Sequence, residues 1–582
     1  MTAATTPGAG DSAAAAVLAS AAASGVQRLW FTSGSELTSF QEAAARARHA
    51  GEPTPEIVTC PHEHVALTAA MGDTMVSGRP AMTAAHADLG LLHHGGAIHN
   101  AMWGDHPVLI MSGYPPTRAE SRTSPVFWKQ QRWDQGSIVR QYVKWDYKLS
   151  ALDDPGLIVA RGLQVALAPR RGPVYLAVPE EVGRHPVPAT GRVPSAQALG
   201  VPVLGPGDAG VVSEVARRLT TARRPVIVTD RVGEYPRAVA LLAELADSLG
   251  VEVRATRYRM NLPDDSPWRS TAPLDEFDVV VVLDHPVPWM PAMEQPRDDA
   301  WIGWVGPDPI ESRVPLHELR ADARTTADPA AFLAAVLGEV GGAGASDADQ
   351  VRRRRQRPPV DAAARPETSG VPAAGMPTPA LIAAALDRHL SPDDLLTWEV
   401  FDTATVTRTK PGTLFEKGGS SLGWSVAAAT GASIASGGAH AVAVTGDGSY
   451  LFGSPDSCLW LQQQHDAPVV TVVVNNGGYR TGTTTLAAHY PGGLAAAEPT
   501  VIGGHLTPSP DFAAHARSQG CYGERVVRAA DLAAALDRAR TAVERHRVPA
   551  VLDVWVPEHL TGSMDPGRRE RARTTTEGSN DG

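Results

Sequence analysis

Cysteine is rare in this chain. The 582 residues include three cysteines, Cys60, Cys458 and Cys521, which are scattered and form no CxxC pair. Disulfide bonds and a cysteine-bound zinc site are therefore not expected. A reducing, cytoplasmic location is expected.

The chain also lacks a basic surplus and a long apolar run. Its net charge of −11 disfavours nonspecific binding to nucleic acid. No apolar run approaches the roughly 18 residues of a membrane span. The Ala-rich start, residues 1–23, has neither a basic segment nor a cleavage region. Neither nucleic acid nor a membrane is expected as a partner.

Two stretches rich in Pro, Gly and small residues, 186–207 and 341–379, divide the chain. The predicted units are an N-terminal domain (1–185), a central domain (208–340), a linker (341–379), a C-terminal domain (380–562) and a disordered tail (563–582). The linker contains the basic run Arg352–Arg355, interpreted as a solvated segment rather than an anion site. Within each domain, short β-rich runs alternate with Ala-rich helical patterns. This alternation predicts an α/β protein with three doubly wound, parallel-sheet domains.

Individual elements follow from the same patterns. Strands are predicted at 57–60, 80–85, 108–112, 225–229, 251–255, 279–283, 301–305, 440–445 and 468–474. Helices are predicted at 62–76 and at about 91–103.

Polar residues follow two of these strands. Gly446-Asp447-Gly448-Ser449 comes after the run 440–445, and Asn475-Asn476 closes the run 468–474. In a doubly wound sheet, the carboxyl ends of the strands face the crevice where ligands bind. A carboxylate, an amide oxygen and a glycine backbone that can approach closely suit a hard cation carrying a diphosphate. A Gly-Asp-Gly sequence alone is also a common turn, and the paired strand ends are more specific.

This pattern resembles the cofactor motif of the thiamine diphosphate-dependent enzymes. Pro61-His62-Glu63-His64 is similar to the strand-to-helix junction of the acetolactate synthase and benzoylformate decarboxylase families. The resemblance runs from about Gly25 to Val556 and implies pyrimidine-binding, central and diphosphate-binding domains. It also implies a homodimer or homotetramer, in which Glu63 of one chain serves the cofactor held by Asp447 of another. On its own, Glu63 also fits an acid that complements a helix dipole.

The resemblance carries further roles to single residues. It implies that the side chains of Asp447 and Asn476 and the carbonyl of Gly478 bind Mg²⁺, while Asn475 braces the turn. Cofactor contacts are implied for Glu63, Leu422, Gly446, Gly448, Ser449, Gly478 and Tyr479. Glu63 would share a proton with the aminopyrimidine ring. Leu422 would support the bent cofactor, although it also fits plain core packing. The segment 399–402 resembles a loop near the cofactor.

His86 distinguishes between reaction types. The run from His86 to Pro107 aligns without gaps with benzoylformate decarboxylase, whose catalytic histidine falls at His86. A histidine at the end of a strand can deliver a proton after carbon dioxide leaves. Acetolactate synthases differ where this chain has residues 87–90. A purely structural histidine is the alternative.

Substrate contacts are predicted with less detail. The loop 32–36 resembles a substrate-binding loop but is one residue shorter, so Ser33, Gly34 and Ser35 all stay candidates. Gln131 lies among Phe127, Trp128 and Trp133, which fit a substrate pocket and a subunit interface equally well. His93, beside His94, is a further candidate, with a helix-surface position as the alternative. The central domain lacks a GxGxxG sequence, so FAD is not expected.

Together these residues predict a thiamine diphosphate- and magnesium-dependent carboxy-lyase that decarboxylates a small 2-oxo acid. One alternative is an acetolactate synthase-like carboligase, which joins the decarboxylated fragment to a second carbonyl compound. Another is a cofactor-binding homologue without turnover. The intact residues Glu63, Asp447 and Asn476 argue against this last alternative.

Overall fold

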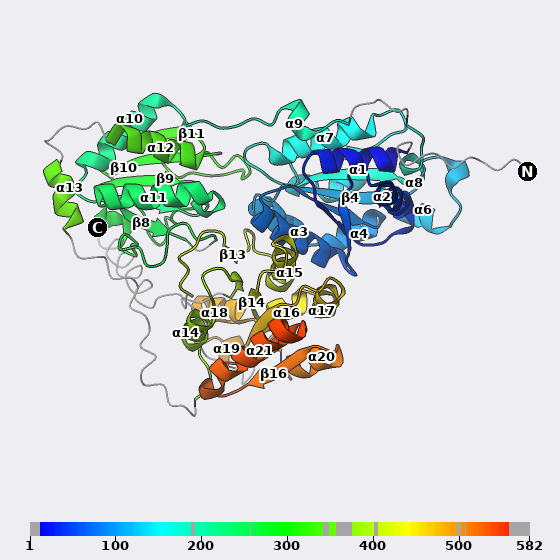
Figure 1. The fold of residues 1–582 in the computed structure, drawn as a ribbon. Helices are drawn as coiled ribbons and strands as arrows, with labels where there is room; N and C mark the ends of the chain where they lie inside the picture. Colours follow the sequence, from blue (N-terminus) through cyan, green and yellow to red (C-terminus); the bar gives the residue numbers. More distant parts are fainter. Residues whose placement is uncertain are drawn as a thin grey trace, which may run out of the picture.

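The computed structural model shows three α/β domains (Figure 1). It describes residues 12–187, 193–256, 258–340, 348–356, 375–400, 406–497, 502–506 and 508–557. The predicted tail and most of the predicted linker lie outside these residues. Each domain has one sheet of parallel strands, which confirms the predicted fold class. Among the described residues, no helix combines the length and apolarity needed to cross a membrane.

The N-terminal sheet has the strand order β2-β1-β3-β4-β6-β5. Its strands are β1 (Arg28–Phe31), β2 (Glu56–Thr59), β3 (Ala81–Ala85), β4 (Val108–Tyr114), β5 (Asp146–Lys148) and β6 (Val174–Pro179). Successive side chains of a strand point to opposite faces of the sheet, and each face packs into a core of its own. Leu29 and Phe31 lie in one core with α1 (Ala13–Ala23), α2 (Thr38–Ala50) and α7 (Pro155–Leu167). Trp30 lies in a second core with α3 (Glu63–Ser77).

The central sheet has the order β11-β10-β9-β7-β8. Its strands are β7 (Pro225–Thr229), β8 (Glu252–Ala255), β9 (Val279–Leu283), β10 (Trp301–Gly306) and β11 (Ala323–Thr326). One core joins this sheet to α10 (Ala209–Thr221), α11 (Pro236–Leu249) and α12 (Pro329–Val340). The other core, around Phe277, Trp289 and Trp304, contains irregular connections instead of α-helices. The connection from β8 to β9 contains Pro263, Pro267 and Pro273, which cannot continue a helix.

Part of the predicted linker docks on this domain. Residues Ala348–Arg355 form α13, and the buried Arg354 donates to the carbonyl oxygens of Leu219 (2.7 Å) and Thr220 (3.2 Å) at the end of α10. The basic run therefore includes one residue that stabilises a helix C-terminus.

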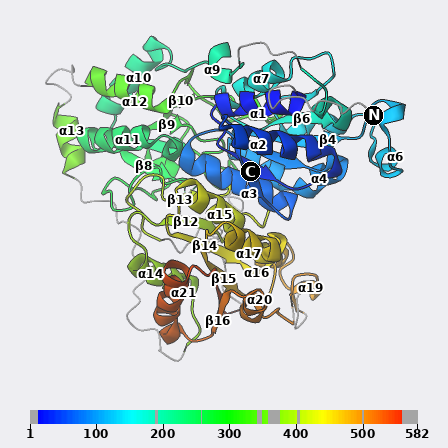
Figure 2. The ribbon, with the colours of Figure 1, turned by 45° about the vertical axis from the view of Figure 1, so that its right-hand side comes forward.

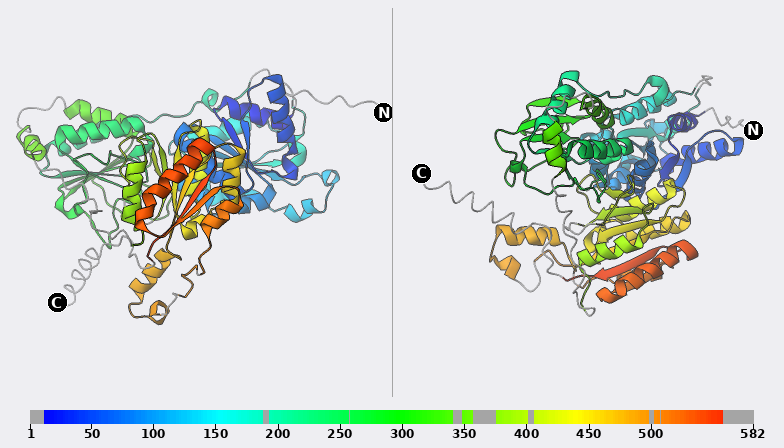
Figure 3. Two further views of the ribbon diagram at one scale, coloured as in Figure 1. Left: turned by 60° about the horizontal axis from the view of Figure 1, so that its bottom comes forward. Right: turned by 60° about the vertical axis from the view of Figure 1, so that its left-hand side comes forward.

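The C-terminal sheet has the order β13-β12-β14-β15-β17-β16. Its strands are β12 (Leu395–Glu399), β13 (Leu414–Glu416), β14 (Ala441–Gly446), β15 (Val470–Asn475), β16 (Tyr522–Val526) and β17 (Ala550–Trp555). Helices α14 (Pro379–His389) and α21 (Leu532–His546) cover one face, and α15 (Ser425–Ala435) and α17 (Pro455–Gln464) cover the other. Helix α18 (Arg480–His489) has no buried residue and projects from the domain together with α19 (Leu494–Ala497) (Figure 3).

The N-terminal and C-terminal domains share a core. Helix α3 of the first packs against α15 of the second, as two views show (Figures 1 and 2). Glycines allow this close crossing: a Cβ at Gly431 would lie 1.9 Å from the carbonyl oxygen of Ala69. The packing of these two helices therefore fixes how the domains sit together.

Buried ion pairs join the N-terminal and central domains. Arg170 donates to Asp105 (2.7 Å) in its own domain and to Asp284 (2.8 Å), which follows β9. Arg231, which follows β7, donates to the carbonyl oxygen of Trp103 (2.9 Å). These side chains lie where the strand order of the central sheet reverses, the usual ligand crevice of such a sheet. The expectation that FAD is not bound stays a prediction.

The predicted strands agree with the structure to within two residues at each end. The single helix predicted at about 91–103 is wrong, because the chain forms α4 (Ala87–His94) and α5 (Ala97–Trp103). The break falls at Gly95 and Gly96. Gly95 has a φ of +49°, and a Cβ at Gly96 would lie 1.9 Å from Oγ of Ser421 in the C-terminal domain. The glycine pair thus lets another domain approach the backbone closely.

The three cysteines are buried and unpaired. Burial raises the pKa of Cys521 to about 11 and that of Cys458 to about 12. Thiolates, which are the reactive form, are therefore scarce at neutral pH.

Candidate active site

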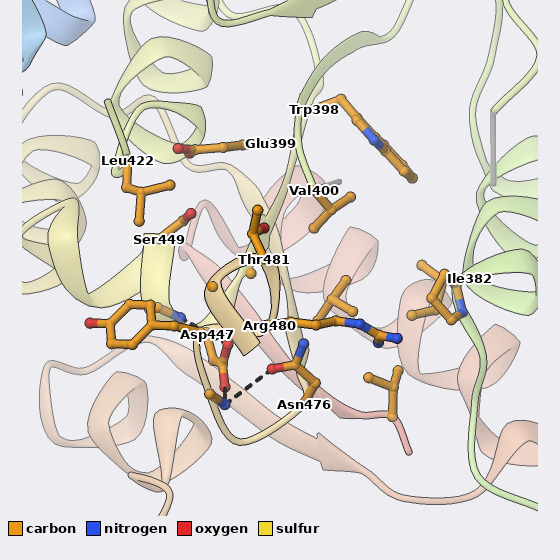
Figure 4. Close-up of a pocket in the computed structure, with 18 of the residues that line it drawn as sticks. Ile382, Trp398, Glu399, Val400, Leu422, Asp447, Ser449, Asn476, Arg480 and Thr481 are labelled. Atoms are coloured by element: carbon orange, nitrogen blue, oxygen red, sulfur yellow. Dashed lines mark hydrogen bonds between the residues drawn. The ribbon is translucent and has the colours of Figure 1, made fainter. Parts of the chain in front are cut away.

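A cavity of about 460 Å³ opens at the carboxyl ends of β12, β14 and β15 (Figure 4). Its lining includes Glu399, Leu422, Gly446, Asp447, Gly448, Ser449, Asn476, Gly478 and Tyr479. The structure thus brings together every residue that the sequence predicted for the cofactor and the metal in this domain. Such crevices at strand ends are the usual ligand sites of doubly wound sheets.

Asp447 presents a buried carboxylate to this cavity. It begins α16 (Asp447–Phe452), directly after β14. Its Oδ2 accepts a hydrogen bond from the amide of Gly478 (3.0 Å), and burial raises its pKa to about 6. Among the described residues, Asp447 has no cationic partner. A divalent cation would supply that missing charge, so the donor set fits a metal of the magnesium type.

The two asparagines differ in role. Oδ1 of Asn476 accepts from the same Gly478 amide (3.1 Å), so Asp447 and Asn476 converge on one point (Figure 4). Asn475 instead turns into the protein, where it donates to Oδ1 of Asp553 (2.8 Å) and accepts from the amide of Gly477. This is the turn-bracing position that the sequence predicted for Asn475.

Glycines shape the cavity wall. A Cβ at Gly448 would lie 2.6 Å from the ring of Tyr479, and one at Gly478 would lie 2.3 Å from the carbonyl oxygen of Gly504. At Gly446, by contrast, nothing lies within 4 Å of such an atom. Gly446 therefore leaves open space at the strand end, where a phosphate could approach the backbone.

Glu399 holds the segment that carries Leu422. Its carboxylate accepts hydrogen bonds from the amides of Gly423 (2.9 Å), Trp424 (2.9 Å) and Ser425 (2.8 Å) at the start of α15. Leu422 and Ser449 both extend toward the cavity (Figure 4). Residues 401 and 402 of the predicted loop lie outside the described residues.

The N-terminal domain contains a second cluster, around Glu63. Glu63 begins α3 and is buried, and its Oε2 lies 3.2 Å from Nδ1 of His93 on α4. A Cβ at Gly90 would lie 2.9 Å from Oε1 of Glu63. A helix-surface position fits His93, whose side chain is 60% exposed, but it does not fit His94. His93 contacts Glu63, and the fully buried His94 has its pKa lowered to about 3 by burial.

His86 lies at the sharp turn between β3 and α4, where Ala87 has a φ of +38°. Its Nδ1 lies 2.6 Å from Oε2 of Glu36, and this hydrogen bond raises the pKa of His86. A Cβ at Gly34 would lie 2.7 Å from that Nδ1, so only glycine fits beside the ring. Sequence reasoning named the loop 32–36 but assigned no role to Glu36; the available signal was that Glu36 is the one charged residue of this loop.

The glutamine that contacts His86 is Gln130, one residue before Gln131, which the sequence analysis named as a substrate contact. Nε2 of Gln130, at the end of α6 (Val126–Gln130), lies 2.6 Å from Nε2 of His86. At Gln131 the helix has ended and the backbone is extended. No described hydrogen bond joins the side chains of Ser33, Ser35 or Gln131 to His86.

The two clusters do not meet within the described chain. Every residue that lines the cavity lies between Pro379 and Val556, in the C-terminal domain. Glu63 and His86 belong to the N-terminal domain. The geometry of one chain therefore contains two separate half-sites.

Comparison with known proteins also assigns cofactor binding to two separate domains of the chain. Residues 11–138 match a family model described as the N-terminal TPP binding domain of thiamine pyrophosphate enzymes, and residues 400–554 match the C-terminal TPP binding domain. The chain is 27% identical to benzoylformate decarboxylase of Pseudomonas aeruginosa over 448 residues, which cover 72% of this chain and 78% of the relative. It is 24% identical to a probable acetolactate synthase of Mycobacterium bovis, over 91% of this chain and 93% of that protein.

Solved structures agree with the fold. The 4-hydroxybenzoylformate decarboxylase of Rhodococcus jostii superposes with a TM-score of 0.75 at 22% identity, covering 94% of this chain and 99% of that one. Fold, site and comparisons together define an α/β enzyme with two cofactor-binding domains. The chain belongs to the thiamine diphosphate-dependent enzymes of the decarboxylase and acetolactate synthase family.

Proposed function

We propose that this protein is a magnesium-dependent decarboxylase that converts a 2-oxo acid into an aldehyde. The observation that carries the proposal is the 2.6 Å contact between His86 and the buried Glu36. Decarboxylation to an aldehyde needs a proton to replace the departing carbon dioxide. A histidine whose pKa is raised by a carboxylate is suited to hold that proton at neutral pH.

The C-terminal cavity would hold the diphosphate end of thiamine diphosphate. Asp447 and Asn476, with the carbonyl of Gly478, would bind Mg²⁺. Gly446, Gly448, Ser449, Leu422 and Tyr479 would contact the cofactor. When bound, the cofactor supplies the electron sink that decarboxylation needs. Glu63 would share a proton with its pyrimidine ring.

The two half-sites support a homodimer. Exposed apolar side chains lie close to each half: Leu89 and Leu92 on α4, and Phe452 and Trp460 on α16 and α17. Such surfaces mark protein interfaces. A symmetric pair of chains would bring Glu63 of one protomer to the cavity of the other, and a homotetramer would contain two such pairs.

The substrate class follows from the relatives. Two of them are named as decarboxylases of benzoylformate and 4-hydroxybenzoylformate, which are aromatic 2-oxo acids. The test is to incubate the protein, Mg²⁺ and thiamine diphosphate with aromatic and aliphatic 2-oxo acids, and to measure carbon dioxide, aldehyde and acyloin.

Aldehyde equal to carbon dioxide supports the proposal. Acyloin as the main product would replace it with a carboligase, the activity that the likeness to a probable acetolactate synthase over 91% of the chain favours. Cofactor binding without any carbon dioxide would favour the homologue without turnover.

A further inference from the structure

Both ring nitrogens of His86 are in short contacts with buried groups. Nδ1 faces Glu36 at 2.6 Å, and Nε2 faces the side-chain nitrogen of Gln130, also at 2.6 Å. Gln130 is only 3% exposed. No ring nitrogen is therefore left over for a reacting substrate while Gln130 stays in place.

Gln130 can serve either protonation state of the ring. With a proton on Nδ1 shared with Glu36, a bare Nε2 accepts from the amide NH₂ of Gln130. A protonated Nε2 instead needs an acceptor, which the amide oxygen becomes after a half rotation. In the structure Oε1 of Gln130 is buried and has no partner among the described residues. The rotated amide would satisfy this oxygen.

The segment that carries Gln130 is fixed to α4, the helix that begins directly after His86. Arg132 forms a 2.7 Å ion pair with the buried Asp88, in the first turn of α4. The hydroxyl of Tyr114 donates to the carbonyl oxygen of Arg132 (2.9 Å). These two contacts of Arg132 hold the neighbouring Gln130 against His86.

We propose that Gln130 is a positioning residue for His86: its amide holds Nε2 toward the site in either protonation state and yields that nitrogen to the substrate. This inference rests on the proposed role of His86 as the proton donor. In the proton transfer itself, the N–H bond at Nε2 breaks and a C–H bond forms on the product carbon. The ring returns to its neutral form with the Nδ1 proton facing Glu36.

Substitutions at this position should move the pKa of His86 in opposite directions. The charged groups that face the ring are Glu36 on the preceding loop, Glu63 on α3, and Asp88 on α4 with its partner Arg132. Gln130→Glu adds a carboxylate beside Nε2 and should raise the pKa. Gln130→Leu removes the acceptor for the protonated form and should lower it. Gln131→Leu, one residue along, should leave it unchanged.

The experiment is an NMR titration of histidine side chains in the cofactor-free protein, with His86→Asn used to assign the resonance. We expect the pKa of His86 to be highest in the Gln130→Glu variant, intermediate in the wild type and lowest in the Gln130→Leu variant. The Gln131→Leu control should give the wild-type value. The same apparent pKa in all four proteins would overturn the proposal. Gln130→Glu keeps the side-chain size, so the comparison survives if Gln130→Leu does not fold.

A second measurement separates this inference from the proposed function. On the loaded enzyme, the pH above which kcat/KM declines should follow the NMR order. The NMR order without turnover of any 2-oxo acid would leave the role of Gln130 standing and remove the decarboxylase proposal. If the enzyme turns over but the pH dependence of kcat/KM is the same in wild type and in the Gln130 variants, only the proposed role of Gln130 is removed.

Discussion

A Cβ atom at Gly72 would lie 2.0 Å from the carbonyl oxygen of Ala428. The first residue belongs to α3, which begins with Glu63, and the second to α15, which follows Leu422. The crossing point therefore joins the two helices that start at the two half-sites. Its spacing sets the relative position of the N-terminal and C-terminal domains within one chain.

Gly72→Ala should destabilise the protein, because the new methyl group meets backbone that cannot move as a side chain can. Overpacking of this kind typically costs about 1–3 kcal/mol. The measurement is the thermal unfolding midpoint of the purified protein. Gly338→Ala is the matched control, since Gly338 is also helical (in α12) and a Cβ there would meet nothing within 4 Å. Equal midpoints for the two variants would contradict the close crossing.

Glu36→Gln should weaken stability in a pH-dependent way. The folded-state pKa of His86 is raised above its ordinary value of 6.5 by Glu36. The stabilisation from this pair is therefore fully present below the unfolded pKa and is lost as the pH rises through the folded one. Urea midpoints of wild type and variant should differ more at about pH 6 than at about pH 9. A difference that grows with pH would show that His86 is not charged beside Glu36.

Gly446→Ala should separate cofactor binding from folding. Its φ of −77° suits alanine, and nothing lies within 4 Å of the new atom, so the cofactor-free protein should keep its unfolding midpoint. Calorimetry should nevertheless show weaker binding of thiamine diphosphate with Mg²⁺, because the methyl group occupies space for the phosphate. Wild-type affinity would mean that the diphosphate does not approach this glycine.

Two inactive variants should complement each other if the site is shared. Glu63→Gln and Asp447→Asn each damage one half-site. In a mixed dimer, one site combines both defects and the other is intact. After dissociation and random reassociation, activity should recover to about a quarter of the wild-type value. Mixed chains that remain inactive would place both halves of a working site on one protomer.

Sequence patterns predicted the parallel sheets and the C-terminal cavity because both depend on local signals. Buried strands are runs of Val and Ala, and Asp447 and Asn476 follow two of them directly. The contacts that sequence missed are long-range. Glu36 meets His86 across fifty residues of chain, and nothing in a single sequence marks such a pairing. Gln130 and Gln131 look alike in sequence, and only the end of a helix decides which one faces the ring.

Irregular connections were the other source of error. Gly95 and Gly96 break one expected helix into two because Ser421 of another domain takes the space that a side chain would need. The helix-rich pattern around them gave no sign of this neighbour. A break imposed by a distant domain cannot be read from local periodicity.

The burial of all three native thiols has a practical use. Because none is accessible, a single cysteine introduced at Leu494, which is 86% exposed on α19, would be the one site open to maleimide dyes. A fluorophore there would report on the projecting α18–α19 segment as chains associate and ligands bind. The three native cysteines would not have to be replaced to obtain that signal.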